Sequence, residues 1–129
     1  MNVERPHPTD SELAILKVLW ERGPAAVHDV RAALGGAEAI GYTTVLKLLQ
    51  IMFEKGLVVR RAEGRRHVYS AVLARADTER RLVTRLMKQA FDGSATRLVQ
   101  GALAAKPASA AELAESGASA SSQVQPRAS

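Results

Sequence analysis

The residues best suited to chemistry in this chain are polar and basic, and they share one predicted helix, residues 41–55. The other face of that helix is an apolar stripe with the spacing i, i+3, i+4, i+7 and i+8. The stripe consists of Val45, Leu48, Leu49, Met52 and Phe53. Hydroxyl, amide and ammonium groups on the polar face can bind base edges or phosphate in the major groove of DNA. A surface helix of an ordinary small domain fits the same pattern, so the flanking segments must decide between the two interpretations.

We predict that the polar face of this helix reads DNA. The expected base contacts are Thr43, Thr44 and Lys47, because hydroxyl and ammonium groups can reach the hydrogen-bonding atoms of base edges. Gln50 and Leu46 are secondary candidates. We expect Leu46 to be exposed, where it could contact the methyl group of a thymine.

The segment that follows the helix has the pattern of a β-hairpin. Residues 57–61 and 67–72 alternate or are rich in β-branched residues, and residues 62–66 between them contain Gly64. A hairpin directly after a helix-turn-helix is the wing of a winged helix. The sequence therefore predicts a wing with Arg65 and Arg66 at its tip.

The predicted wing is strongly basic. Five groups that carry or can carry positive charge surround a single acid, and they are Arg60, Arg61, Arg65, Arg66 and His67. We expect these cations to repel each other until an anion arrives, which favours phosphate contact over a merely solvated hairpin. The DNA-binding residues expected outside the base contacts are Tyr42 at the helix start and Arg65, Arg66 and His67 in the wing.

Catalytic and metal chemistry are not indicated by any motif. The chain has no cysteine, and His7, His28 and His67 lie in separate predicted elements. No nucleophile elbow, phosphate-binding glycine loop or catalytic carboxylate pair is present. His28 beside Asp29 could be a metal ligand or a base, but a helix-capping pair is the better interpretation. We therefore predict no enzymatic activity, no catalytic residues, no metal site and no cofactor.

Composition agrees with a soluble, basic domain. The 129 residues include 18 Lys and Arg against 13 Asp and Glu, which gives a net charge of +5 and favours a polyanionic partner. Aromatic residues make up only 4%, so the core is expected to be aliphatic. With no signal peptide and no apolar run long enough to span a bilayer, we expect a cytoplasmic protein without direct membrane binding.

The segment before residue 41 predicts the rest of a helix-turn-helix core. Thr9 and Glu12 form a capping-box pattern at the start of a helix over residues 10–21. A shorter helix is expected over residues 27–34, with a short strand at 25–27 before it. The positions expected to face inward are Leu13, Leu16, Val18, Leu19, Trp20, Val30, Ala33 and Leu34.

Two further amphipathic helices are predicted after the wing. They cover residues 74–91 and 95–104, with a break at Asp92-Gly93 and a cap at Ser94. Two such helices cannot bury their apolar stripes completely on each other, so we expect self-association, although folding back onto the winged helix is an alternative. The expected dimerisation residues are Leu82, Val83, Leu86, Met87, Phe91, Leu98, Val99 and Leu103.

The predicted fold class is therefore α+β, mainly α. A winged helix-turn-helix domain is expected over residues 1–73 and a helical dimerisation region over 74–115. Residues 109–115 have the pattern of one or two weak helical turns. Residues 116–129, rich in Ala, Ser and Gln, are expected to form a disordered tail.

The order of these parts resembles the BlaI/MecI penicillinase-repressor family of bacterial winged-helix regulators. The resemblance covers roughly residues 9–105 and rests on the order and spacing of several short stretches. These stretches are residues 9–13 (TDSEL), 17–20 (KVLW), 42–45 (YTTV), 54–58 (EKGLV), 64–69 (GRRHVY) and 91–94 (FDGS).

The resemblance implies a homodimeric repressor that binds a palindromic operator, with the third helix in the major groove and the wing on phosphate. It also implies release from DNA when a membrane-bound metallopeptidase sensor causes cleavage in the dimerisation region. In family members that repress β-lactamase the cut bond joins Asn and Phe, and Gly101-Ala102 stands at the equivalent position here. Ile51 stands where an arginine is common on the recognition helix, so the operator sequence does not transfer. Without cysteine, the chain lacks the C-terminal cluster of the copper-responsive branch.

Three other classes of protein compete with a repressor. A winged-helix adaptor that binds protein predicts a neutral or acidic third helix and a wing without arginine. A regulator controlled by a small ligand predicts an aromatic and polar pocket between the winged helix and the helical segment. A small hydrolase requires a catalytic set, which the sequence does not contain.

Overall fold

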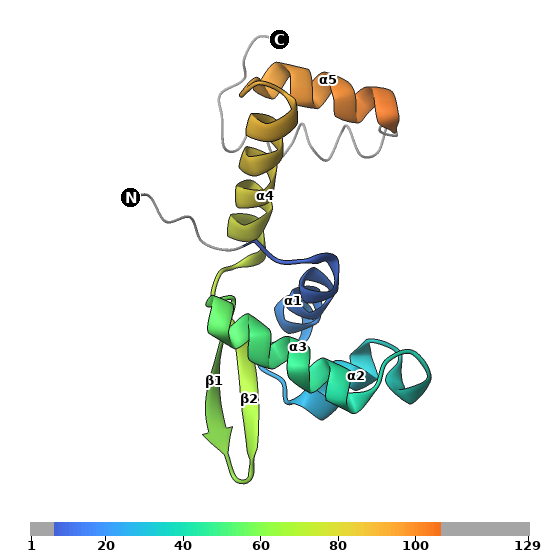
Figure 1. Ribbon diagram of the computed structural model, residues 1–129, viewed down its shortest axis with the longest axis vertical. Helices are drawn as coiled ribbons and strands as arrows, with labels where there is room; N and C mark the ends of the chain where they lie inside the picture. Colours follow the sequence, from blue (N-terminus) through green and yellow to red (C-terminus); the bar gives the residue numbers. More distant parts are fainter. Residues whose placement is uncertain (1–6, 107–129) are drawn as a thin grey trace. The chain divides into compact units, whose positions relative to one another are not determined.

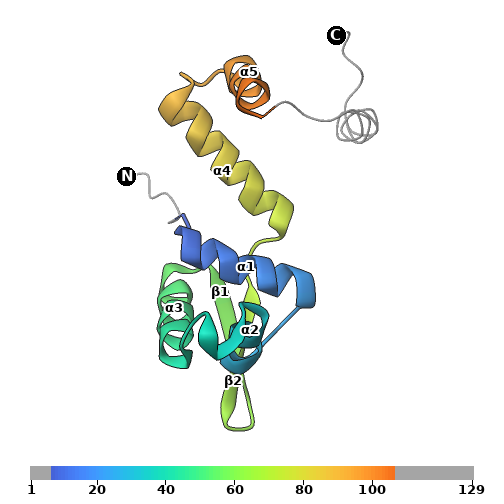
Figure 2. The ribbon, with the colours of Figure 1, turned by 90° about the vertical axis from the view of Figure 1, so that its right-hand side faces the viewer.

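The computed structural model describes residues 7–106, which are mainly helical and include one two-stranded antiparallel sheet (Figure 1). The chain divides into two compact units between Leu82 and Val83. In the first unit, three helices pack together: α1 (Asp10–Arg22), α2 (Val27–Ala33) and α3 (Tyr42–Lys55). The hairpin of β1 (Val58–Glu63) and β2 (Arg66–Ala71) extends beyond them (Figure 2). The predicted α+β, mainly α, fold class is confirmed. The turns predicted over 109–115 and the tail predicted over 116–129 lie outside the described residues.

Helix α1, Asp10–Arg22, begins with the predicted capping box. The Thr9 hydroxyl accepts the Glu12 N–H at 3.2 Å, and a Glu12 carboxylate oxygen accepts the Thr9 N–H at 3.0 Å. The same Glu12 oxygen accepts from Lys55 Nζ at 2.6 Å, although only 2% of Glu12 is exposed. Glu12 therefore ties the start of α1 to the end of α3, Tyr42–Lys55.

Replacing Glu12 with alanine is expected to lower the free energy of unfolding by about 1–3 kcal/mol, because it removes a cap and one partner of a largely buried ion pair. Glu12→Gln keeps the reciprocal capping bond and loses the charge, so urea unfolding of both variants separates the two contributions. Asp10→Ala, an exposed acid in the same turn, is the control. Equal unfolding midpoints for Glu12→Ala and Asp10→Ala would contradict the role given to Glu12.

The core is aliphatic, as predicted, with Tyr69 as its one fully buried aromatic residue among those described. Its members include Ile15, Leu16, Leu19, Val27, Val30, Val45, Leu49, Met52 and Val58. Ile15 is completely buried and was absent from the predicted inward set. Leu13 and Trp20 are only partly buried at the edge of this core.

Two positions predicted to be apolar contacts lie at the surface. Helix α2, Val27–Ala33, directs Val27, Val30 and the following Leu34 inward, so the predicted inward Ala33 falls beside this stripe and is exposed. Phe53 is 38% exposed because it sits at the edge of the α3 stripe. The guanidinium group of Arg60 packs over the Phe53 ring, and its Cζ lies 4.1 Å from the ring centroid.

The strand predicted at 25–27 reduces to a single bridge. The N–H of Ala25 donates to the Tyr69 carbonyl at 3.0 Å, and the N–H of Tyr69 donates back at 2.8 Å. The expected strand is wrong beyond this pair, because Val27 already begins α2. A 3₁₀ turn, Gly36–Glu38, then connects α2 to α3.

The wing is a tighter hairpin than predicted. β1, Val58–Glu63, pairs with β2, Arg66–Ala71, from Val58–Ala71 to Glu63–Arg66. The turn therefore contains two residues, Gly64 and Arg65, rather than the five predicted. Gly64 has φ 66°, and two-residue hairpin turns need a positive φ at this first position.

The second unit contains the end of α4, Arg75–Ala90, and all of α5, Ala95–Ala105. The Ser94 hydroxyl caps α5 by accepting the Arg97 N–H at 3.1 Å, as predicted. The ring of Phe91 packs so closely on Gly101 that a Cβ there would stand 3.1 Å from Phe91 Cε1. Within residues 7–106, every helix is too short or too polar to cross a bilayer.

Candidate nucleic-acid interface

Helix α3 presents its predicted polar face to solvent. Val45, Leu49 and Met52 have no exposed surface and so fix the rotation of the helix against the core. The opposite face carries the exposed side chains of Tyr42, Thr43, Thr44, Lys47 and Gln50. The helix begins after Gly41 without a side-chain cap and has no acid in its first turn. This end of α3 therefore offers free backbone N–H groups and the positive end of the helix dipole.

Leu46 is not exposed as predicted. It is partly buried and packs against the hydrophobic core, because it lies next to Val45 on the side of α3 that faces the wing. Its remaining surface opens into a hollow between α2, α3 and β2. Contact of Leu46 with a thymine methyl would have to occur through that hollow.

The hollow brings several predicted DNA-binding residues together. Its lining consists of Ala26, Val27, His28, Tyr42, Leu46, Arg65, Arg66, His67 and Tyr69. The side chains of Thr43, Thr44, Lys47 and Gln50 lie outside this lining, further round or along α3. Basic and hydrogen-bonding groups from three elements thus converge where α3 begins.

His28 is a member of this hollow that sequence reasoning did not assign to DNA. Asp29 Oδ2 accepts the Ala26 N–H at 3.2 Å, so Asp29 has the predicted capping role, while His28 is exposed. The bridge between Ala25 and Tyr69 places the start of α2 beside the wing. No local sequence pattern signals this neighbourhood, because it depends on pairing between distant residues.

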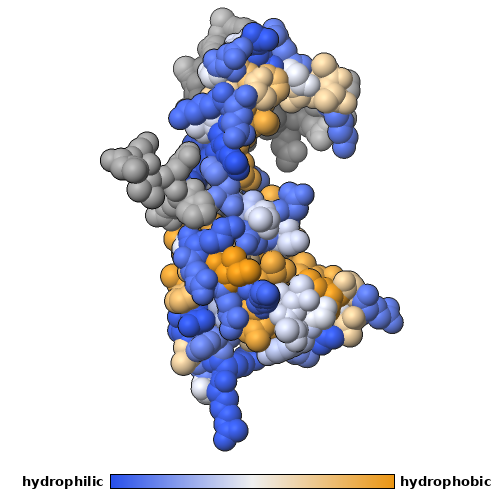
Figure 3. Space-filling model, viewed as in Figure 1, coloured by the Kyte–Doolittle hydropathy of each residue, from blue (hydrophilic) through white to orange (hydrophobic). Residues whose placement is uncertain are grey.

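The wing tip is a hydrophilic protrusion (Figure 3), but its cations are not all unpaired. Glu63 Oε2 lies 3.0 Å from Arg61 Nη2, and Glu63 Oε1 lies 3.5 Å from Arg66 Nη2. Arg60 is held over Phe53. Arg61 and Arg66 therefore share one carboxylate, and Arg60 keeps its charge over the aromatic ring, so the expected repulsion is reduced but the wing stays net positive. Among the described residues, Arg65 has no carboxylate within 4.0 Å.

The predicted dimerisation residues fall into two groups. Leu82, Met87, Phe91 and Leu98 are partly buried. Val83 and Leu86 on α4 are each 46% exposed, and Val99 and Leu103 on α5 are 54% and 46% exposed. Among the described residues from 83 to 106, these four are the large apolar side chains that are clearly exposed. They are therefore the ones available to a partner.

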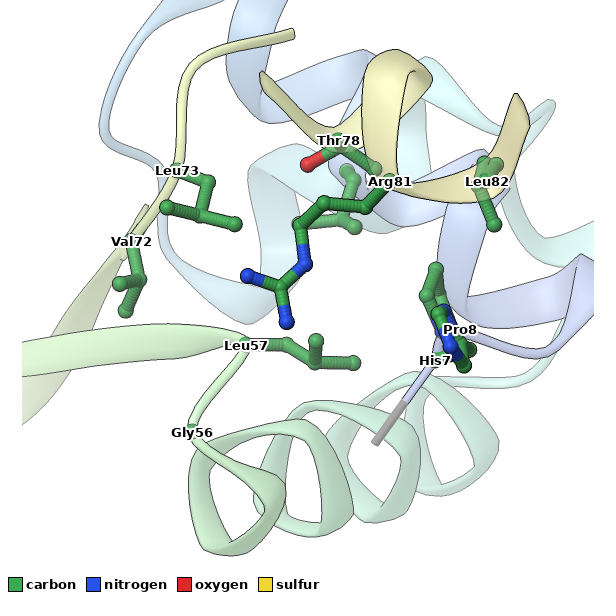
Figure 4. A pocket seen from close by; sticks show the side chains of 10 residues that line it. His7, Pro8, Gly56, Leu57, Val72, Leu73, Thr78, Arg81 and Leu82 are labelled. Carbon is green, nitrogen blue, oxygen red and sulfur yellow. The ribbon is translucent and has the colours of Figure 1, made fainter. Parts of the chain in front are cut away.

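A second hollow, entirely within the first unit, bears on control by a small ligand. It is lined by His7, Pro8, Leu16, Gly56, Leu57, Val72, Leu73, Thr78, Arg81 and Leu82. Figure 4 shows the Arg81 side chain extending into its middle, toward Leu57. The space left between the side chains is about 20 Å³, which is room for about one water molecule. This hollow is too full for a ligand-sensing pocket unless Arg81 moves.

The described part of the chain has no cluster of side chains suited to binding a metal ion. Across residues 7–106, no three His, Asp or Glu side chains are grouped so as to hold a metal ion. The geometry instead joins an exposed polar helix to a basic hairpin. Three packed helices followed by this hairpin define a winged-helix protein.

Comparison with known proteins gives the family. Residues 8–116 match the family model described as penicillinase repressor, and the chain belongs to that family. The resemblance inferred from the sequence is thereby confirmed.

Individual relatives agree with this assignment. The chain is 34% identical over 84 residues to the transcriptional regulator BlaI of Mycobacterium tuberculosis, in strain CDC 1551 / Oshkosh and in strain ATCC 25618 / H37Rv. The match covers 64% of this chain and 61% of the relative, so the chain spans about three fifths of the length of these relatives. A solved structure, the DNA binding domain of the repressor BlaI, matches with a TM-score of 0.51 and 25% identity, over 59% of this chain and 93% of that one.

Proposed function

We propose that this chain is a non-enzymatic transcriptional repressor that binds operator DNA as a homodimer in the cytoplasm. The observation that carries the proposal is the exposed face of α3, which presents hydroxyl, amide and ammonium groups beside a basic wing. Membership of the penicillinase repressor family supports it, as does the likeness to the DNA binding domain of BlaI.

In the proposed complex, α3 enters the major groove. Thr43, Thr44 and Lys47 read base edges from its exposed face, and Gln50 extends the same face by one turn. The DNA phosphate backbone beside the groove lies along the hollow at the start of α3. Tyr42 and the arginines of the wing tip line this hollow. The uncapped N-terminus of α3 adds backbone N–H donors for phosphate.

Arg65→Ala is expected to weaken binding to every duplex alike and to lower the slope of log affinity against log salt by about one. Arg65 is the wing-tip cation without a carboxylate partner among residues 7–106, so its charge is available to phosphate. Fluorescence anisotropy titrations at several salt concentrations measure both quantities.

The matched control for this prediction is Arg80→Ala. Arg80 is 70% exposed on α4 and pairs with Asp77, so this variant loses the same charge away from the wing. If the two variants have the same affinity and salt slope, the wing does not contact phosphate through Arg65.

We propose that the homodimer forms through the second unit. Val83 and Leu86 on α4 and Val99 and Leu103 on α5 supply the apolar surface. A two-fold dimer presents two copies of α3 to two half-sites, so the operator is expected to be palindromic. The exposed apolar side chains support this proposal, because the first unit already has its own core.

We also propose that repression is relieved by proteolysis in the dimerisation region, linked to a membrane-bound metallopeptidase sensor. Family membership supports this step. Gly101-Ala102 lies inside α5 rather than in an exposed loop tip, where proteolysis concentrates, so α5 must open locally before a cut there. Intact-mass spectrometry of the protein from induced cells tests the proposal. A shortened N-terminal fragment is expected, and full-length chain alone would contradict it.

A further inference from the structure

Glu63 is the one acid in the basic wing, and its position is unusual for a DNA-binding surface. It is the last residue of β1 and pairs directly with Arg66 across the turn. Arg61 lies two residues earlier on the same strand, so its side chain shares a face of the hairpin with Glu63 and Arg66. Each carboxylate oxygen of Glu63 takes one of these guanidinium groups, at 3.0 Å for Arg61 and 3.5 Å for Arg66.

These ion pairs contribute little to holding the fold. The side chains of Glu63, Arg61 and Arg66 are 48%, 61% and 58% exposed, and ion pairs of such exposure add little to stability. The hairpin is held instead by its strand ladder and by the burial of Val58, Val68 and Tyr69. A role in binding therefore explains Glu63 better than a role in folding.

A carboxylate between two guanidinium groups occupies the place that a phosphate group would take. Both anions accept charge-assisted hydrogen bonds from the planar fork of arginine. Glu63 holds one nitrogen of each guanidinium group. A DNA phosphate must therefore either displace Glu63 or bind the remaining N–H donors close to its negative charge, which repels the phosphate. Arg65, which has no such partner among the described residues, stays available throughout.

We propose that Glu63 competes with DNA phosphate for Arg61 and Arg66. This competition, called here the restraint by Glu63, lowers the affinity of the protein for polyanions. This proposal rests on the proposed DNA-binding function and adds to it a residue that sets affinity for the DNA backbone. Random DNA is bound almost entirely through phosphate contacts, so displacing Glu63 directly lowers affinity for it. At the operator, base contacts from α3 add binding free energy on top of the same displacement.

The test is Glu63→Gln, measured by fluorescence anisotropy on a random duplex and on a duplex from the protein's own promoter. We expect affinity for the random duplex to rise about fivefold and its salt slope to steepen by about one. The affinity for the promoter duplex is expected to rise by a similar factor, because the displacement of Glu63 is removed from both complexes. The melting temperature is expected to stay unchanged, because the pairs are exposed.

Three controls make the result specific to the wing. Glu79→Gln removes the same charge from an exposed ion pair on α4 and is expected to bind like the wild type. In a chain that already carries Arg61→Ala and Arg66→Ala, adding Glu63→Gln is expected to have a much smaller effect, because its partners are gone. Glu63→Asp, which keeps the charge, is expected to bind close to the wild type.

The outcomes separate this proposal from the function on which it rests. If the wild type binds DNA but Glu63→Gln binds no more tightly than Glu79→Gln, the restraint by Glu63 is wrong and the repressor proposal stands. An undiminished effect of Glu63→Gln without Arg61 and Arg66 would also overturn the restraint. If the wild type binds neither duplex, the DNA-binding function itself fails.

Discussion

A chain carrying Leu86→Asp is expected to be monomeric at concentrations at which the wild type is dimeric. Leu86 is 46% exposed and lies one turn after Val83 on the same face of α4. Fully burying an exposed leucine is worth about 1.5–3 kcal/mol, and because Leu86 is 46% exposed, covering it in the dimer is worth about half of that. Two-fold symmetry loses this contribution twice, or about 1.5–3 kcal/mol per dimer, before the cost of burying two carboxylates is added. The dimer dissociation constant is therefore expected to rise at least about tenfold.

Sedimentation velocity over a series of protein concentrations measures this change. Lys88→Asp is the control, because it places a carboxylate at an exposed position on the opposite face of the same helix. The control is expected to remain dimeric. A Leu86→Asp chain with the mass and dissociation constant of the control would show that this face of α4 is not the interface. A wild type that stays monomeric throughout would contradict the dimer itself.

Lys47→Ala is expected to have the largest effect on DNA recognition. Lys47 is exposed on α3 opposite the buried Val45 and Leu49, which places its ammonium group where base edges lie in the proposed complex. Loss of a base contact is expected to weaken operator binding by about 1–3 kcal/mol and to relax the preference at one base pair.

Anisotropy measurements on operator duplexes with single base-pair changes test the role of Lys47. In the variant, one position should lose its discrimination while the others keep theirs. Lys17→Ala, an exposed lysine on α1 away from the proposed interface, is the control. If Lys47→Ala instead weakens all duplexes by one common factor, Lys47 contacts phosphate rather than a base.

Local patterns in the sequence were enough to predict the elements that carry the interface. The capping box of Thr9 and Glu12 and the cap at Ser94 depend only on residues within one helical turn, and both form. The apolar spacing of α3 likewise determines which of its faces is buried, so the exposure of Thr43, Thr44 and Lys47 follows from it.

Features that depend on distant residues could not be predicted in this way. His28 joins the wing only because Ala25 pairs with Tyr69. The turn is two residues long because Glu63 and Arg66 pair across it, and charge counting alone did not reveal that Glu63 pairs with two arginines at once.

The predicted dimerisation stripes show a related limit. An apolar stripe predicts that a helix face is buried, but it does not predict which segment or molecule buries it. Phe91 is partly buried and packs on Gly101 within its own unit, whereas Val99 and Leu103 stay exposed. Helical periodicity predicts burial equally for both kinds of residue. Only the packing in the structure shows which of them have intramolecular contacts and which stay exposed.

The measurement that tests the repressor proposal most directly is fluorescence anisotropy of a labelled duplex from the protein's own promoter, compared with a random duplex across a salt series. The proposal predicts tighter binding to the promoter duplex, a steep salt dependence for both duplexes, and a reduced preference in Lys47→Ala. Weak binding to both duplexes that does not change with salt would contradict it. The basic wing would then be solvated charge, and a winged-helix adaptor that binds protein would be the better account.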